Sequence, residues 1–129
     1  MISTFLKGFI IFLIIDAIWI YGVALPMYQS TLGNLINSNM TQNPALIAAA
    51  FGVYILLVLG IVVFVMPLTK NMTLLSSALY GGLYGLIAYG VFAMTNYSVL
   101  KPWTAALMFA DLFWGFSVCA IVTVCLKLL

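Results

Sequence analysis

Four long apolar segments dominate the pattern of hydrophobic and polar residues along the chain. They cover about residues 5–25, 45–66, 74–95 and 103–126. A bilayer core of about 30 Å requires roughly 20 consecutive apolar residues in a helix, so each segment is long enough to cross a membrane. Membrane β-strands are shorter and alternate in polarity, unlike these segments. The pattern therefore predicts an all-α membrane protein, a single transmembrane domain built as a four-helix bundle.

Prolines flank several of the predicted spans. The first span is expected to stop at Pro26, and the second lies between Pro44 and Pro67. Proline is tolerated just before a helix begins or just after it ends, because its missing N–H is not needed there. These positions support the predicted ends of the spans.

The connection between the first two spans, from Pro26 to Asn43, is the longest polar stretch. Apolar or aromatic residues recur in it at helical spacing, at Tyr28, Leu32, Leu35 and Ile36, and the polar run 37–39 follows. This spacing predicts a short helix lying at the membrane interface, with a solvated loop as the alternative.

Composition excludes several classes of protein. Of the 129 residues, 67% are hydrophobic and 5% are charged, and the mean hydropathy is +1.30. A soluble domain carries about 25% charged residues, so a soluble enzyme is excluded. The net charge of +2 is too small for a nucleic-acid-binding surface. Membrane lipids are the expected surroundings.

The lysines predict an orientation. With the N-terminus inside the cell, Lys7, Lys70 and Lys127 lie on the cytoplasmic side and only Lys101 lies outside, as the preference of positive residues for cytoplasmic loops requires. Both termini are therefore expected in the cytoplasm. Because the first apolar segment carries Asp16 and has no small-residue cleavage site, it is expected to be a retained helix.

Metal and cofactor chemistry has little support. The chain contains no histidine, the commonest protein ligand of haem, zinc and copper, so no metal site and no cofactor are predicted. Cys119 and Cys125 lie six residues apart on one predicted helix, about 9 Å along it, and face different ways. A disulfide between them is not expected.

Asp16 and Asp111 are the charged residues in the interior of the predicted spans. Measured from the predicted helix centres, both lie on the same side of the membrane, about 4 Å apart in depth. An aspartate at a helix centre costs about 2.5 to 3.5 kcal/mol on insertion scales. The two acids are therefore candidates for a small-molecule, cation-binding or proton-coupling site, whether protonated, ionised in a wet cavity or paired with a bound cation.

Other polar and aromatic side chains fall near the two acids. Tyr54 and Tyr89 lie on the same side of their helix centres, and Asn96 lies further out at the mouth. Both acids stand in an Asp-x-x-Trp motif, with Trp19 and Trp114. As an alternative, each carboxyl could accept a hydrogen bond from an indole or a tyrosine and clamp two helices. Such bonds average about 0.6 kcal/mol in membranes, less than the insertion cost, so the sequence favours a functional site.

Small residues recur every fourth position in the third span, at Ser77, Gly81 and Gly85. This spacing lets two helices approach closely. Packing inside the bundle is the expected use, and a homodimer interface is the alternative.

The chain also resembles a known family. The residues that carry the resemblance are Gly85-Leu86-Ile87-Ala88-Tyr89-Gly90, Thr95-Asn96-Tyr97, Leu100-Lys101-x-Trp103, Asp111-x-x-Trp114-Gly115 and Asp16-x-x-Trp19. They resemble a bacterial family of predicted four-helix membrane proteins catalogued as domain of unknown function 2177. That family has an aspartate two residues before the Thr-Asn pair, where this chain has Ala93. The resemblance implies the fold and the bacterial inner membrane, and it implies no activity and no catalytic residues.

Two functions from different classes are favoured. The first is binding or transport of a small molecule or cation at the buried aspartates, which requires a polar cavity that reaches both acids. The alternative is an accessory subunit that binds a lipid or another apolar ligand for a membrane enzyme or complex, which requires a groove open sideways to the bilayer. A homodimer or a partner membrane protein fits either function. An enzyme ranks lower, because the chain has two carboxyls but no recognisable catalytic motif.

Overall fold

The computed structural model describes residues 1–37 and 40–129, and every regular element in this part of the chain is a helix. The first long helix consists of α1 (Ile2–Trp19), the π-helical turn η1 (Ile20–Ala24), α2 (Leu25–Leu32) and the 3-10 turn η2 (Gly33–Leu35). The second consists of α3 (Pro44–Gly60), the π-helical turn η4 (Ile61–Val65) and α4 (Met66–Leu68). The third is α5 (Leu74–Val99) and the fourth is α6 (Ala105–Leu128). All four are long and apolar enough to span a membrane, which confirms the predicted architecture.

Pro26 does not end the first helix, and that part of the prediction was wrong, whereas the second helix begins at Pro44 as predicted and ends one residue past Pro67, at Leu68. The first helix continues past Pro26 to Leu35, and the second continues through Pro67. In both, a π-helical turn precedes the proline: the N–H of Leu25 bonds to the carbonyl of Ile20, five residues back, and Met66 repeats this pattern with Ile61. The proline then falls in the first turn of a new α-helical segment, where no N–H is required.

The helical turns predicted in the first connection exist, although they continue the first helix. α2 ends at Gly33, whose φ of 55° is a left-handed conformation that glycine adopts without strain. A 3-10 turn, η3 (Met40–Gln42), then leads to Asn43, whose side chain accepts a hydrogen bond from the N–H of Ala45 and caps α3. The last two residues of the predicted polar run, Ser38 and Asn39, lie outside the described residues.

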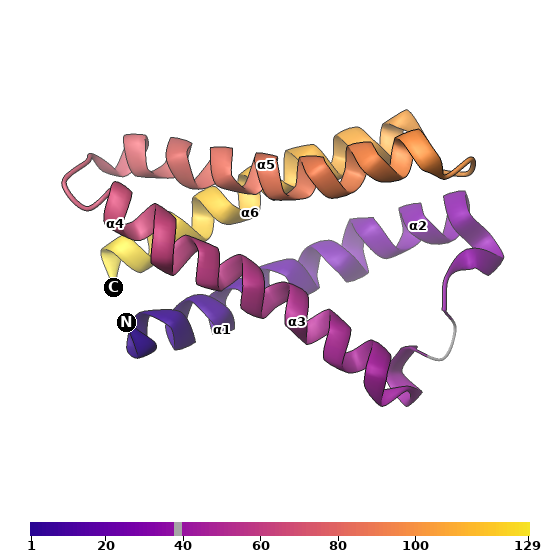
Figure 1. Ribbon diagram of the computed structural model, residues 1–129, viewed down its shortest axis with the longest axis horizontal. Coiled ribbons are helices and arrows are strands. Elements are labelled where there is room, and N and C mark those ends of the chain that lie inside the picture. The colour runs from indigo at the N-terminus through magenta and orange to yellow at the C-terminus, as the bar shows by residue number, and fades with distance from the viewer. Residues whose placement is uncertain (38–39) are drawn as a thin grey trace.

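The two termini lie at one end of the bundle, together with the turn between α4 and α5 (Figure 1). The end of α2 and the turn between α5 and α6 lie at the other end. Lys127 ties the first end together, because its ammonium donates to the carbonyl oxygens of Thr69 at 2.5 Å and Met72 at 3.2 Å. α5 and α6 run side by side along their length, whereas α3 diverges from them (Figure 1).

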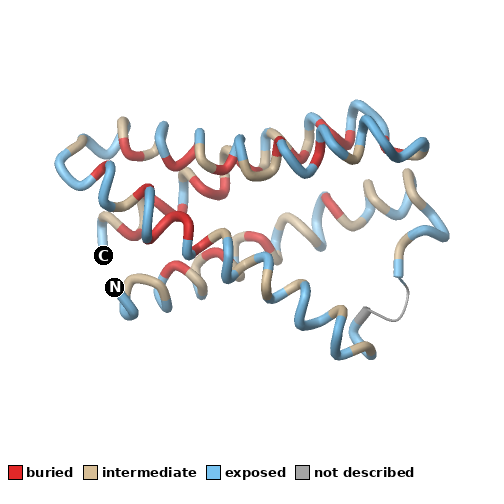
Figure 2. The backbone as a smooth tube through the Cα atoms, in the orientation of Figure 1, coloured by how far each residue is buried: buried red, intermediate tan, exposed pale blue. Residues whose placement is uncertain are grey.

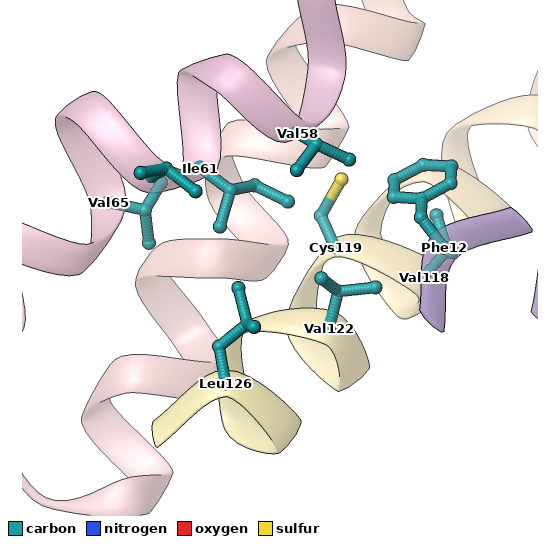
Figure 3. Close-up of a cluster of buried hydrophobic side chains, with 9 residues drawn as sticks. Phe12, Val58, Ile61, Val65, Val118, Cys119, Val122 and Leu126 are labelled. Carbon is teal, nitrogen blue, oxygen red and sulfur yellow. The ribbon is translucent and has the colours of Figure 1, made fainter. Parts of the chain in front are cut away.

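The hydrophobic core lies where α1, the second helix and α6 meet. Figure 2 shows buried residues gathered at this crossing and mostly exposed ones toward the start of α3. Phe12 of α1, Val58 of α3 and Cys119 of α6 point toward one another there (Figure 3). The other buried members are Ile61, Val62, Val65, Val118, Val122 and Leu126. Cys119 therefore acts as a small apolar core residue, and both Cys119 and Cys125 are free cysteines.

The small residues of α5 pack against α6. A methyl group at Gly85 would overlap the carbonyl of Gly115, and one at Gly81 would overlap Thr123 and the Cys119 backbone. The two backbones are therefore nearly in contact. This confirms that the small-residue pattern serves packing inside the bundle, and α6 occupies the face where a homodimer interface was the alternative.

Candidate functional site

Asp16 joins three helices through its carboxyl group. The hydroxyl of Tyr54 on α3 donates to Oδ2 at 2.5 Å, and the indole Nε1 of Trp114 on α6 donates to Oδ1 at 2.6 Å. Both lengths lie at or below the short end of the ordinary range for hydrogen bonds from a hydroxyl and from an indole N–H. Asp16 is buried, so these bonds replace the hydration that the carboxyl loses.

The two Asp-x-x-Trp motifs meet at their tryptophans. The rings of Trp19 and Trp114 stack with centroids 4.6 Å apart and an interplanar angle of 2°. Because α1 and α6 are antiparallel, Asp16 and Asp111 lie on opposite sides of this stack, about 9 Å apart along the bundle. That separation exceeds the predicted depth difference, since the first helix starts earlier and ends later than predicted and its centre lies elsewhere.

Asp111 has a different partner. The hydroxyl of Tyr28 on α2 lies 3.0 Å from its Oδ1 and 2.9 Å from its Oδ2, so one donor is shared between both oxygens. Each aspartate therefore bonds to aromatic side chains of other helices, which is the geometry of the clamp alternative. The clamp at Asp111 is weaker than that at Asp16, because it has one donor where Asp16 has two.

Trp103 lies beside the Tyr28–Asp111 bond. Its ring contacts Tyr28 at 5.5 Å between centroids and Phe92 edge-on at 5.7 Å. Trp103 is 7% exposed and packs inside the protein. Its buried Nε1 has no hydrogen-bond acceptor among the described residues. An unpaired buried donor costs about 1 to 3 kcal/mol.

The cations of the chain lie away from both acids. Lys7, Lys70 and Lys101 are exposed, and Lys127 donates to backbone carbonyls at the opposite end of the bundle from Tyr28. The part of the chain that the structure describes has no group of three or more metal-ligating side chains.

Tyr89 belongs to a groove between α3 and α5. The groove has a volume of about 370 Å³, and its walls are Val53, Leu56, Leu57, Ala88, Tyr89 and Phe92. It forms because α5 meets the second helix at η4, so that α3 and α5 diverge beyond that point. Leu56 is 69% exposed and Phe92 is 51% exposed, so the groove is open to the side, where the bilayer lies around a membrane span.

The structure brings some of the predicted residues together and leaves others apart. Asp16, Tyr54, Trp19 and Trp114 form one contiguous group. Asp111 belongs to the neighbouring group with Tyr28, and Tyr89 faces the groove. Asn96 is half-buried on α5, one turn beyond the buried Ala93, and lines none of the three cavities found. Neither aspartate lines a cavity among these three.

Sequence reasoning missed Tyr28 as a partner of Asp111. The predicted end of the first span at Pro26 separated Tyr28 from the bundle. The apolar run gave no signal for this continuation, because it does not show that a π-helical turn lets the helix continue past Pro26.

Comparisons with known proteins agree with this architecture. A family model described as "Predicted membrane protein (DUF2177)" matches residues 1–127, so the chain belongs to this family. Searches against curated proteins and against solved structures gave no significant match.

Proposed function

We propose that this member of the DUF2177 family of predicted membrane proteins binds a membrane lipid, with an acyl chain lying in the groove between α3 and α5. The observation that carries the proposal is the groove itself. Five of its six lining residues are aliphatic or phenyl side chains, and the sixth is Tyr89. Its volume of about 370 Å³ lies in the usual range for ligand sites, about 300 to 1,000 Å³.

The position of the groove selects a lipid over a soluble ligand. Its walls belong to two helices that are long and apolar enough to span a membrane, and exposed apolar residues flank it. A ligand that enters sideways from the bilayer passes only lipid acyl chains and apolar side chains before it reaches the groove. This supports the accessory role in which the protein binds a lipid for a membrane enzyme or complex.

A transporter that uses Asp16 and Asp111 for a small molecule, a cation or protons is the second candidate. The observation in its favour is that two buried carboxyls have no lysine beside them. Aromatic donors already bond to both acids, however, and the three cavities found are bordered by other residues. Lipid binding explains the open apolar groove between α3 and α5, which a transporter built on the two acids does not.

Filling the groove tests the proposal. Ala88→Phe places a phenyl ring between the walls, and Ala106→Phe adds the same ring at an exposed position of α6. We expect Ala88→Phe to lower phospholipid retention about tenfold after purification in detergent, as measured by native mass spectrometry, and Ala106→Phe to leave it unchanged. Equal retention by the two variants would contradict the proposal.

We infer that both termini lie in the cytoplasm, in the inner membrane of a bacterium. The exposed Lys7 and Lys70 and the half-buried Lys127 belong to the end of the bundle that holds the termini, and Lys101 belongs to the other end. The excess of positive residues at one end supports this orientation.

A further inference from the structure

Tyr28, Trp103 and Asp111 form a polar cluster near the turn that joins α5 to α6. The Tyr28 hydroxyl donates to Asp111, while the Tyr28 ring contacts the ring of Trp103. Trp103 packs against Phe92, which also lines the groove between α3 and α5. The cluster therefore borders the groove.

Two groups in the cluster have unused hydrogen-bonding capacity of opposite kinds. The Nε1 of Trp103 is a buried donor without an acceptor among the described residues. Asp111 is 6% exposed, and its two oxygens share a single donor, although a carboxylate has about four acceptor positions. Since the lysines are exposed or bonded elsewhere, the cluster lacks a cation for Asp111 and an acceptor for Trp103.

We propose that this cluster binds the headgroup of a phospholipid that carries a primary ammonium, as phosphatidylethanolamine does; this inference rests on the proposed function of the groove. The ammonium donates to Asp111, a phosphate or ester oxygen accepts from Trp103, and an acyl chain passes Phe92 into the groove. A zwitterionic headgroup supplies both missing groups in one molecule. Ammonium-to-carboxylate bonds are charge-assisted and stronger than the bond from a neutral hydroxyl.

The headgroup reaches Asp111 by displacing the Tyr28 hydroxyl. α2 is suited to move, because none of its residues is fully buried and it begins directly after a π-helical turn, with Pro26 as its second residue. Within residues 1–37 and 40–129, the bond from Tyr28 to Asp111 is the hydrogen bond that links α2 to another helix. Because the lipid ammonium replaces the Tyr28 hydroxyl, Asp111 has a hydrogen-bond donor both before and after binding.

The cluster begins near the headgroup region, at Trp103, and extends inward along α6 to Asp111. Trp103 precedes α6, and Asp111 comes six residues after the first residue of α6, about 9 Å along it. The 24 residues of α6 span about 36 Å, more than the roughly 30 Å hydrocarbon core, so the helix ends extend toward the polar region of the bilayer.

Lipids that differ only in the ammonium group test the proposal. The purified protein is titrated with phosphatidylethanolamine or phosphatidylcholine of identical acyl chains, and the bound fraction is measured by native mass spectrometry. We expect phosphatidylethanolamine to bind about tenfold more tightly, because the choline nitrogen has no N–H to donate. Asp111→Asn should abolish this preference, and Asp16→Asn should retain it.

A second variant, Tyr28→Phe, tests the same proposal while leaving the carboxyl of Asp111 in place. Tyr28→Phe keeps the ring against Trp103 but removes the hydroxyl that competes for Asp111. We expect this variant to bind phosphatidylethanolamine about fivefold more tightly and phosphatidylcholine as before. A purely structural clamp would give no gain in affinity. Glycerophosphoethanolamine, which has the headgroup without acyl chains, should not compete at equal concentration.

The outcomes separate this inference from the proposed function. Equal binding of the two lipids or an unchanged preference in Asp111→Asn would overturn the headgroup assignment. Full competition by glycerophosphoethanolamine would show that the acyl chain adds no affinity and would overturn the joint placement of headgroup and chain. If Ala88→Phe still weakens binding of both lipids in that case, the groove remains a lipid site. If Ala88→Phe affects neither lipid, the proposed function fails as well.

Discussion

At the scale of single residues, the two buried aspartates are held with different strength. Asp16 accepts one hydrogen bond at each oxygen, and both donors come from other helices. Asp111 shares one hydroxyl between its oxygens and lies beside an unpaired indole N–H. Asp16 therefore fits a structural role, and Asp111 retains the capacity to bind a ligand.

Substitution of two tyrosines, Tyr54 and Tyr84, tests how much the hydrogen bond to Asp16 contributes to stability. The Tyr54 hydroxyl donates to Asp16, and the Tyr84 hydroxyl donates to the backbone carbonyl of Leu57 at 3.0 Å. Leaving one oxygen of a buried carboxyl without its donor costs about 1 to 3 kcal/mol, whereas an ordinary neutral hydrogen bond contributes about 0.5 to 1.5 kcal/mol. Tyr54→Phe should therefore lower the free energy of unfolding more than Tyr84→Phe does, as measured by denaturation in mixed micelles. A larger loss in Tyr84→Phe would contradict the assignment of Asp16 and Tyr54 as a stabilising pair.

These pairings explain the limits of the sequence prediction at this scale. The sequence alone shows that Asp16 and Asp111 lie inside predicted spans. Because burying a carboxyl there is costly, each one requires a hydrogen-bond partner. Which aromatic residue supplies it depends on helix rotation and on how far each helix extends. Tyr54 could be selected by its depth and Trp114 by its Asp-x-x-Trp motif, whereas Tyr28 was placed outside the first span.

At the scale of the helices, hydropathy predicts where the spans lie but not how they end. The second, third and fourth helices agree with their predicted spans to within four residues, and the first ends at Leu35, beyond its predicted end at 25. The first two helices continue through Pro26 and Pro67, because a π-helical turn shifts the hydrogen bonds before each proline. Hydrophobicity carries no signal for that shift, since the apolar run is unbroken at both places.

The contact between α5 and α6 depends on Gly85. Gly85→Ala places a methyl group against the Gly115 carbonyl, and neither backbone can move aside alone. We expect a loss of about 1 to 3 kcal/mol in unfolding free energy. Gly52→Ala on α3 is the matched control, because nothing lies within 4 Å of the added methyl; it should stabilise the helix by about 0.5 to 1 kcal/mol. Similar unfolding midpoints for both variants would refute the close packing of α5 on α6.

At the scale of the whole molecule, the distribution of lysines predicts sidedness. In a cysteine-free background, a single cysteine at position 101 should react with a membrane-impermeant maleimide added outside intact cells. A cysteine at position 70 should react only after the membrane is permeabilised. The reverse pattern would invert the orientation inferred from the exposed lysines at the two ends.

The groove is also a property of the whole molecule, which is why the sequence did not predict its position. Tyr89 was selected for its depth, but the groove arises because α3 diverges from α5 beyond η4. Crossing angles between apolar helices depend on packing at the contact, here on close-packed core residues such as Val58, and hydropathy does not encode them.

Photolabelling in lipid bilayers tests the central claim most directly. The protein is reconstituted with a phospholipid that carries a diazirine on its acyl chain, and the labelled residues are identified by mass spectrometry. Lipid bound in the groove predicts labels concentrated on Leu56, Leu57 and Tyr89, above those on Phe113, which is 67% exposed on α6. Labelling spread over exposed residues in proportion to their exposure, with no excess in the groove, would contradict the account.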